Sequence, residues 1–134
     1  MSECYRRYNR RKFCLKVHLV LVCKYRKHLL FGEIDCLLKQ KIHRLCKAHQ
    51  WALLAMETDA DHVHLLIEYD TTESVCSIVR TIKQETTYEL WLKCKTILQT
   101  FYWKKQILWS DGYFACSIGD VSTEIIQKYI ESQG

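Results

Sequence analysis

The chain has 134 residues, of which 49% are hydrophobic and 26% charged, the balance of a single globular domain. This composition excludes a disordered tail, a collagen-like repeat and a coiled coil, and no apolar run reaches the roughly 20 residues of a membrane span. The net charge of +5 is uneven, since residues 1–28 hold nine Lys or Arg and one acid, and residues 29–134 hold eleven and fourteen. A basic front predicts a polyanionic partner, most simply nucleic acid, although a solvated basic tail that aids solubility has the same pattern.

Hydrophobic periodicity predicts strands where apolar residues alternate and helices where they recur every three or four positions. The expected elements are a basic arm over 1–12, a strand over 13–23, a basic loop over 24–33, a helix over 34–49, hairpin strands over 51–58 and 61–69 joined at Asp59-Ala60, a long helix over 73–92, a short helix before Trp109, a strand over 113–118 and a final helix over 122–133. This order predicts one α/β (α+β) domain over residues 1–134. We expect an antiparallel-rich central sheet flanked by helices, of ferredoxin or RNA-recognition-motif type.

The eight cysteines are scattered, and no two lie closer than nine residues. Without a C-x-x-C pair, neither a zinc knuckle nor a thioredoxin-type motif is indicated. Most of them lie in apolar segments and are expected to be small buried hydrophobes. The sequence starts without an apolar export signal, so we expect reduced thiols and a cytoplasmic protein.

The most distinctive motif is His62-Val63-His64 in a predicted strand. Residues i and i+2 of a strand point to the same face, about 6–7 Å apart by strand rise. Two imidazoles at that spacing can converge on one divalent ion. Two histidines at this spacing also occur by chance, or as core residues whose ring nitrogens are hydrogen-bonded within the protein. The motif alone therefore leaves open whether it is a metal site or a structural feature.

Acidic residues near this pair favour a metal site. A turn at Asp59-Ala60 would place Glu57 directly across from His62, and Asp61 stands beside the pair. His18 lies on the even-numbered face of the first strand. Carboxylates with imidazoles suit Mg²⁺ or Mn²⁺ better than structural zinc. The alternatives are a surface carboxylate at Glu57 and a core histidine at His18.

The last predicted helix carries Tyr129 and Gln133, which are four residues apart and share a face. Periodicity alone favours Tyr129 as a packing residue of an amphipathic helix. The alternative is a nucleophile. A free phenol, with a pKa of about 10, needs a cationic site, or a metal that polarises the electrophile, before it reacts readily.

These motifs together resemble the HUH single-tyrosine transposases of the insertion-sequence 200/605 group. The resemblance covers residues 13–133 in order. Its segments are Val17-His18-Leu19-Val20, Lys24-Tyr25-Arg26, Asp61-His62-Val63-His64-Leu65-Leu66, Ile78-Val79-Arg80 with Ile82-Lys83, Leu108-Trp109-Ser110, Gly112-Tyr113-Phe114 and Tyr129-Ile130-Glu131-Ser132-Gln133. The chain departs from the family pattern at two places. Tyr69-Asp70-Thr71-Thr72 lacks the prolines common after the strand, and Gln84 follows Lys83 of the predicted long helix, where a glycine is common.

The resemblance implies a role for each matching residue. Tyr129 would attack a DNA phosphate, giving a 5′-phosphotyrosine intermediate. His62 and His64 would hold Mg²⁺ or Mn²⁺, with Glu57 and Gln133 completing the ligands. His18 and Asp61 would support the metal site.

The resemblance also implies partners. The substrate would be single-stranded DNA with hairpins at the ends of an insertion element. The protein would be a homodimer with merged sheets, and the tyrosine of one chain would serve either its own histidines or those of its partner. The expected place is the prokaryotic cytoplasm at the nucleoid, with no membrane partner.

Basic residues are the predicted DNA contacts. They are Arg6, Arg7, Arg10, Arg11, Lys12, Lys24, Arg26 and Lys27, with Arg80 and Lys83 from the long helix. Tyr25, Trp91, Trp103 and Trp109 are candidates for stacking on bases.

Other functions remain open at this point. A non-catalytic RNA-recognition-motif-like module explains the element order and the basic front, but gives no reason for His62, His64 and Glu57 to share a face. A replication or conjugation nickase of the HUH class shares the chemistry but is usually longer. A third alternative is an inactive, domesticated transposase.

Overall fold

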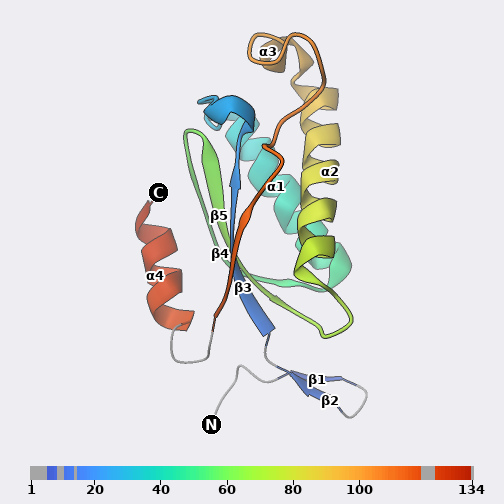
Figure 1. Ribbon diagram of the computed structural model, residues 1–134, viewed down its shortest axis with the longest axis vertical. Coiled ribbons are helices and arrows are strands. Elements are labelled where there is room, and N and C mark those ends of the chain that lie inside the picture. Colours follow the sequence, from blue (N-terminus) through green and yellow to red (C-terminus); the bar gives the residue numbers. More distant parts are fainter. Residues whose placement is uncertain (1–5, 9–10, 14, 119–122, 134) are drawn as a thin grey trace.

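A computed structural model describes residues 6–8, 11–13, 15–118 and 123–133 of the chain (Figure 1). Four strands form an antiparallel sheet in the spatial order β4-β5-β3-β6. The elements are β1 (Arg6–Tyr8), β2 (Arg11–Phe13), β3 (Leu15–Val22), the 3₁₀ turn η1 (Lys24–Arg26), α1 (Gly32–His49), β4 (Ala52–Asp59), β5 (His62–Tyr69), α2 (Val75–Lys93), α3 (Lys95–Leu98), β6 (Phe114–Ser117) and α4 (Thr123–Gln133).

The order of strands and helices confirms the predicted fold class. From β3 to β6 the chain runs β-α-β-β-α-β, and its first and third strands lie side by side in the middle of the sheet. This is the ferredoxin-like arrangement. Figure 1 shows α1 and α2 on one side of the sheet and α4 on the other side. The sheet therefore has one face under two long helices and a second face on which α4 lies.

The main core lies between the sheet and the helices α1 and α2. Val17, Leu19 and Leu21, the odd-numbered residues of β3, are at most 1% exposed. They pack in one cluster with residues such as Leu38 of α1 and Ile82 of α2. Because alternate strand residues point to opposite faces, the even-numbered residues of β3 face the side of α4.

A smaller cluster attaches α4 to the second face. Ile130 of α4 is fully buried and packs with Ala55 of β4, Leu66 of β5 and Ile118. The amide of Gln127 donates to the carbonyl oxygen of Leu54 at 2.6 Å. The described contacts of α4 are thus with the second face of the sheet, in a cluster separate from the main core.

The β4–β5 hairpin turns one residue later than predicted. The predicted turn pairs Glu57 with His62, but the structure pairs Glu57 with His64 and Asp59 with His62. Ala60 and Asp61 lie at the turn, and the Ala60 amide donates to Asp59 Oδ1 at 2.8 Å. A carboxylate just before a turn satisfies a backbone N–H in this way. The pairing differs by two residues, an even number, so Glu57 keeps its predicted face.

The predicted basic arm contains a small antiparallel ribbon where the structure describes it. Arg6 pairs with Phe13 and Tyr8 with Arg11, and this ribbon is separate from the main sheet. Each strand carries two basic residues and ends on an aromatic residue, a type that favours strands. Residues 6–8 and 11–12 of the predicted arm are therefore strands, and Phe13 ends β2 instead of beginning the long strand predicted over 13–23.

The described cysteines are six of the eight, and all six are free. Cys23, Cys46 and Cys94 are buried as expected, whereas the other three are exposed. Burial raises the pKa of Cys23 to about 12 and that of Cys46 to about 11, so both stay protonated thiols.

Among the residues that the structure describes, no helix is both long enough and apolar enough to cross a membrane.

Glu89 of α2 ties the two long helices together by charge. Its side chain is buried, and its Oε2 accepts hydrogen bonds from Arg44 Nη2 of α1 at 2.7 Å and from Lys93 Nζ of α2 at 2.8 Å. These hydrogen bonds, from Lys93 first and then Arg44, lower the pKa of Glu89 from 4.5 to about 2. A carboxylate with a lowered pKa stabilises the fold above its ordinary pKa, and this stabilisation is lost as the pH falls toward the lowered value.

We therefore expect Glu89→Gln to lower the free energy of unfolding by about 1–3 kcal/mol at pH 7, because it leaves three cations, Arg44, Lys93 and Lys41, facing a neutral amide. The difference between variant and wild type should shrink as the pH falls from 4.5 toward 2. Urea denaturation at pH 7 and at pH 3 measures both effects. The control is Glu85→Gln, whose half-exposed carboxylate contacts Lys41 at 3.6 Å and should change stability by less than about 0.5 kcal/mol. An equal loss for Glu89→Gln at both pH values would contradict the charge-based explanation.

Candidate active site

The two histidines of the H-x-H motif lie side by side on the face of the sheet that carries α4. They are the first and third residues of β5, so their side chains point to the same face, and their ring centroids are 4.9 Å apart. In the register of the sheet, Val20 of β3 and Glu57 of β4 flank His64. The strand pattern thus brings both imidazoles to one surface, as the sequence predicted.

Each histidine of this pair has a hydrogen-bonding partner at Nδ1. Asp61 Oδ1 lies 2.7 Å from His62 Nδ1, and His18 Nε2 lies 3.2 Å from His64 Nδ1. In the tautomer in which Nδ1 donates, both rings keep the Nε2 lone pair for a ligand. Such partners orient metal-binding histidines and fix their tautomers. The structure therefore brings His18 and Asp61 to the positions from which they can support the pair.

The charges of this site are set by hydrogen bonds and burial. The hydrogen bond from His62, assisted by Arg26, lowers the pKa of Asp61. Arg26 Nε donates to the other carboxylate oxygen of Asp61 at 3.2 Å. Burial lowers the pKa of His64 and of His18. An ionised Asp61 and neutral imidazoles are the protonation states that metal binding requires.

Tyr129 of α4 lies over the same surface. Its ring centroid is 6.5 Å from that of His64 of the same chain, and the two rings are nearly perpendicular. Tyr129 is 52% exposed, whereas the adjacent Ile130 is fully buried and attaches the helix. The phenol therefore stands beside the histidines while it remains open to a ligand from solvent.

The structure gives no hydrogen bond or ion pair between the histidine pair and the other two predicted metal ligands, Glu57 and Gln133, among the side chains that it describes. Glu57 is half-buried on β4, opposite His64. For Gln133 the structure describes the place in α4 but not the side chain. Among the side chains that the structure describes, no group of three His, Cys, Asp or Glu is arranged to hold a metal ion. A metal site at His62 and His64 therefore stays a prediction, and it would need ligands beyond these two side chains.

Asp59 is a site residue that the sequence reasoning missed. It pairs with His62 across the hairpin, and its charge acts to raise the pKa of His64 against the effect of burial. The misplaced turn put Asp59 in the loop instead of on β4. A carboxylate followed by a two-residue turn was the signal that would have found it.

The predicted DNA contacts fall into separate groups. Lys24, Tyr25 and Arg26 form η1 next to the hairpin of β4 and β5, with Lys27 exposed directly after it. Arg80 is exposed on α2. Four more, Arg6, Arg7, Arg11 and Lys12, belong to the β1–β2 ribbon, and Arg10 lies outside the described residues.

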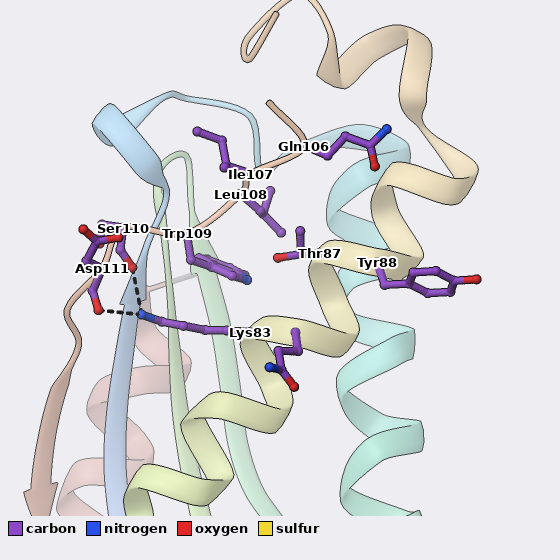
Figure 2. Close-up of a pocket in the computed structure, with 10 residues that line it drawn as sticks. Lys83, Thr87, Tyr88, Gln106, Ile107, Leu108, Trp109, Ser110 and Asp111 are labelled. Atoms are coloured by element: carbon purple, nitrogen blue, oxygen red, sulfur yellow. Dashed lines mark hydrogen bonds between the residues drawn. The ribbon is translucent and has the colours of Figure 1, made fainter. Parts of the chain in front are cut away.

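Lys83 has a structural role that the sequence did not predict. Its ammonium donates to the carbonyl oxygens of Ser110, Asp111 and Gly112 at 2.7, 3.2 and 3.0 Å. Figure 2 shows the side chain extending from α2 toward Ser110 and Asp111, with the Trp109 ring beside it. Burial lowers the pKa of Lys83. These bonds hold the segment that leads into β6, and a DNA contact by Lys83 stays a prediction.

Two of the tryptophans predicted to stack on bases are core residues. Trp91 is 5% exposed and donates to the carbonyl of Ile107 at 2.8 Å. Trp109 is 7% exposed and donates to the hydroxyl of Thr86 at 2.9 Å. Their buried N–H groups are satisfied within the protein, so the stacking prediction was wrong for both. Trp103, in contrast, is 77% exposed.

Comparison with known proteins gives consistent relatives. The family model described as "Transposase IS200 like" matches residues 11–133. The chain is 27% identical to the ISDra2 transposase TnpA of Deinococcus radiodurans, covering 89% of this chain and 84% of that one. It is 29% identical to the transposase for insertion sequence element IS200 of Salmonella typhimurium, covering 88% and 76%.

Two solved structures share the fold. A proposed transposase of Deinococcus radiodurans superposes with a TM-score of 0.77 at 23% identity, over 96% of this chain and 97% of that chain. A REP-associated tyrosine transposase bound to a REP hairpin superposes with a TM-score of 0.66 at 19% identity, over 97% and 70%. At these identities the two structures support the fold of the chain.

Proposed function

Because the chain belongs to the family of IS200-like transposases, we propose that it cleaves and rejoins single-stranded DNA at the ends of an insertion element, with Tyr129 as the nucleophile. The observation that carries this proposal is the position of Tyr129 beside His64 on an open surface. A non-catalytic binding module gives no reason for this arrangement. The family match over residues 11–133 favours a transposase over a replication or conjugation nickase.

The proposed reaction conserves the number of phosphoester bonds. The phenolic oxygen of Tyr129 attacks the scissile phosphorus, and the bond from phosphorus to the 3′ oxygen of the preceding nucleotide breaks. The phenol loses its proton, and the released 3′ oxygen gains one. The products are a 5′-phosphotyrosine and a free 3′-OH, and a later attack by a 3′-OH rejoins the strand. No water or nucleotide cofactor is consumed.

A divalent cation, Mg²⁺ or Mn²⁺, fits the donor set of this surface. His62 and His64 would hold it through Nε2, and Glu57 and Gln133 are the proposed further ligands. When bound, the ion would polarise the scissile phosphate and offset the negative charge that develops during attack. The residues of the chain itself do the orienting, since Asp61 and His18 hold the two rings at Nδ1.

The proposed partners are DNA and a second copy of the chain. The relative solved with a REP hairpin supports element ends that contain hairpins as the DNA substrate. Such a substrate would bring the protein to the nucleoid of the prokaryotic cytoplasm. Fluorescence imaging of the labelled protein would test this location. For the dimer, the support is β6. It lies at the edge of the sheet, and all four of its residues, Phe114–Ser117, are exposed. An uncovered edge strand is a template for pairing with another strand.

We expect sedimentation at micromolar concentration to give twice the monomer mass. Replacing Ala115 of β6 by proline should shift the protein toward the monomer, because it adds a bulky ring and removes a backbone donor at the edge. A monomeric wild type would contradict the dimer.

Whether Tyr129 acts on its own site in that dimer can be tested by mixing Tyr129→Phe and His64→Ala chains. Restored cleavage would indicate action between chains.

The function is tested with single strands from both ends of the chain's own element. The protein, a strand labelled at one terminus, and Mn²⁺ or Mg²⁺ are incubated and run on a denaturing gel. A 5′-phosphotyrosine predicts that the 3′-labelled fragment travels with the protein. The 5′-labelled fragment should be free and extendable by a polymerase. Failure to form an adduct with any divalent ion, while the ends still bind, would favour a binding module or an inactive transposase.

Asp61→Asn is expected to weaken Mn²⁺ binding by about 10-fold, because partners of this kind typically change metal affinity 10–100-fold. The amide keeps the size of the side chain but removes the charge that fixes the His62 tautomer. Isothermal titration with Mn²⁺ measures the affinity without DNA. Asp70→Asn, in the loop after β5, is the matched control and should bind Mn²⁺ like the wild type. Unchanged affinity in Asp61→Asn would contradict the supporting role.

A further inference from the structure

A cavity lies next to the turn η1. It has a volume of about 560 Å³, which is in the range of small-ligand sites, and its main lining residues are Lys24, Tyr25, Tyr102, Trp103, Lys104 and Lys105. The segments on either side of it are far apart in sequence. This surface, which we call the Tyr25–Trp103 pocket, is separate from the surface that carries His62, His64 and Tyr129.

Exposed aromatic rings form its walls. Tyr25 is 71% exposed and Trp103 is 77% exposed, whereas Tyr102 between them in the lining is buried. The Tyr102 hydroxyl donates to the carbonyl of Lys24 at 2.8 Å, and its ring centroid lies 6.5 Å from that of Tyr25. One wall is therefore fixed to the fold, while two large rings stay open to solvent and available for stacking.

The charge of the pocket is positive. Lys104 Nζ lies 4.9 Å from the centre of the Trp103 ring, and Lys24 Nζ lies 5.6 Å from that of Tyr25. Asp111 is the acidic residue in the lining, and it contacts Lys24 at 3.3 Å. Ammonium groups beside aromatic faces are suited to a ligand that combines a flat ring with a phosphate.

The backbone of η1 is held in a conformation that side chains disfavour. Tyr25 has φ +60° and Arg26 has φ +53°, both in the left-handed region that non-glycine residues rarely adopt. Strain of this kind persists where the surrounding structure enforces it, often at binding sites. The same turn exposes the Tyr25 ring and brings Arg26 onto Asp61. The pocket is thus linked to the candidate active site through one three-residue turn.

We propose that the Tyr25–Trp103 pocket binds one unpaired nucleobase of the DNA strand by stacking on the Trp103 ring, with Lys104 and Lys105 against the adjoining phosphates. This inference rests on the proposed function, because it assumes that the ligand is single-stranded DNA. A paired base inside a duplex cannot enter, so the pocket would favour single strands over duplex DNA. Base stacking of this kind is worth a 5- to 150-fold change in affinity.

Trp103 provides its own spectroscopic signal. The other three tryptophans, Trp51, Trp91 and Trp109, are at most 7% exposed, so a stacking ligand should quench the fluorescence of Trp103 selectively. The probes are a 12-nucleotide oligodeoxythymidine, a 12-nucleotide abasic strand of equal charge and a 12-base-pair duplex. Fluorescence anisotropy of labelled probes reports binding, and intrinsic fluorescence reports stacking.

We expect oligodeoxythymidine to bind and to quench, and the abasic strand and the duplex to bind without quenching. Trp103→Ala should weaken oligodeoxythymidine binding at least 5-fold and bring it to the level of the abasic strand, whereas Trp103→Phe should recover part of the affinity. Tyr88→Ala, on an exposed aromatic residue of α2, is the matched control and should leave binding unchanged. Because Trp103 is exposed, its replacement should leave the thermal melt unchanged.

The outcomes separate this inference from the function on which it rests. Binding of oligodeoxythymidine without quenching, and with unchanged affinity in Trp103→Ala, would overturn the pocket while leaving a DNA-cleaving enzyme. Equal quenching by the abasic strand would also overturn it, since no base is then required. If no DNA binds and no adduct forms with the element's own ends, both proposals fail together.

Discussion

Tyr129→Phe is expected to abolish the covalent protein–DNA adduct, with at least a ~10³-fold loss of strand cleavage. The substitution removes one oxygen atom, which is the proposed nucleophile, and leaves a ring that cannot attack the phosphate. The ring itself stays, and the contacts of Ile130 that attach α4 are untouched. The measurement is the rate at which 3′-labelled DNA becomes attached to protein on a denaturing gel.

The variant should still bind DNA as the wild type does, because the hydroxyl of a half-exposed ring contributes little to packing. Tyr88→Phe is the matched control, since it removes a hydroxyl from another exposed tyrosine, and it should cleave normally. Adduct formation that survives in Tyr129→Phe would assign the nucleophile to another residue. It would also leave the position of α4 beside His64 without a chemical explanation.

Removal of either imidazole of the pair is expected to reduce cleavage at least ~10²-fold. His62→Ala or His64→Ala takes away one of two Nε2 donors from a site that already needs further ligands. The charge stabilisation that a bound ion supplies is worth several kcal/mol, which corresponds to a loss of this size. The measurement is the adduct rate as a function of Mn²⁺ concentration, where a weakened site requires more metal.

The control for this pair is His43→Ala, on an exposed position of α1, which should leave the rate and its metal dependence unchanged. Binding of the DNA strand should also be retained in His62→Ala and His64→Ala. If both variants cleave at the normal rate without added Mn²⁺ or Mg²⁺, the two histidines do not hold a catalytic ion. Their shared face would then be a structural feature of β5.

Local patterns predicted much of the fold. The alternation of Val17, Leu19 and Leu21 located β3, and it also placed His18 on the opposite face. The period of α4 located Tyr129 and Ile130 on adjacent parts of one helix. These predictions depend on side-chain directions within a single element, which the sequence pattern determines.

The remaining features depend on contacts between elements, which periodicity does not contain. The hairpin turn differed by one residue because the Asp59 carboxylate binds a backbone amide, and this moved Asp59 into the site. Trp91 and Trp109 were candidates for stacking on bases, but distant hydrogen-bond partners satisfy their N–H groups in the core. Lys83 was interpreted as a DNA contact, whereas its ammonium also holds three carbonyls of a segment 27–29 residues away.

The separate attachment of α4 has a consequence for the dynamics of the site. Among the side chains of α4 that the structure describes, Ile130 and Gln127 anchor the helix, through a small cluster and the hydrogen bond to Leu54. Burying a side chain such as that of Ile130 contributes about 1.5–3 kcal/mol. The helix should therefore open locally while the sheet and the two long helices stay folded. Its amides should exchange with solvent deuterium well before those of β3 and β5. A DNA end joined to Tyr129 would travel with that helix, so the histidines and the bound strand would separate without global unfolding.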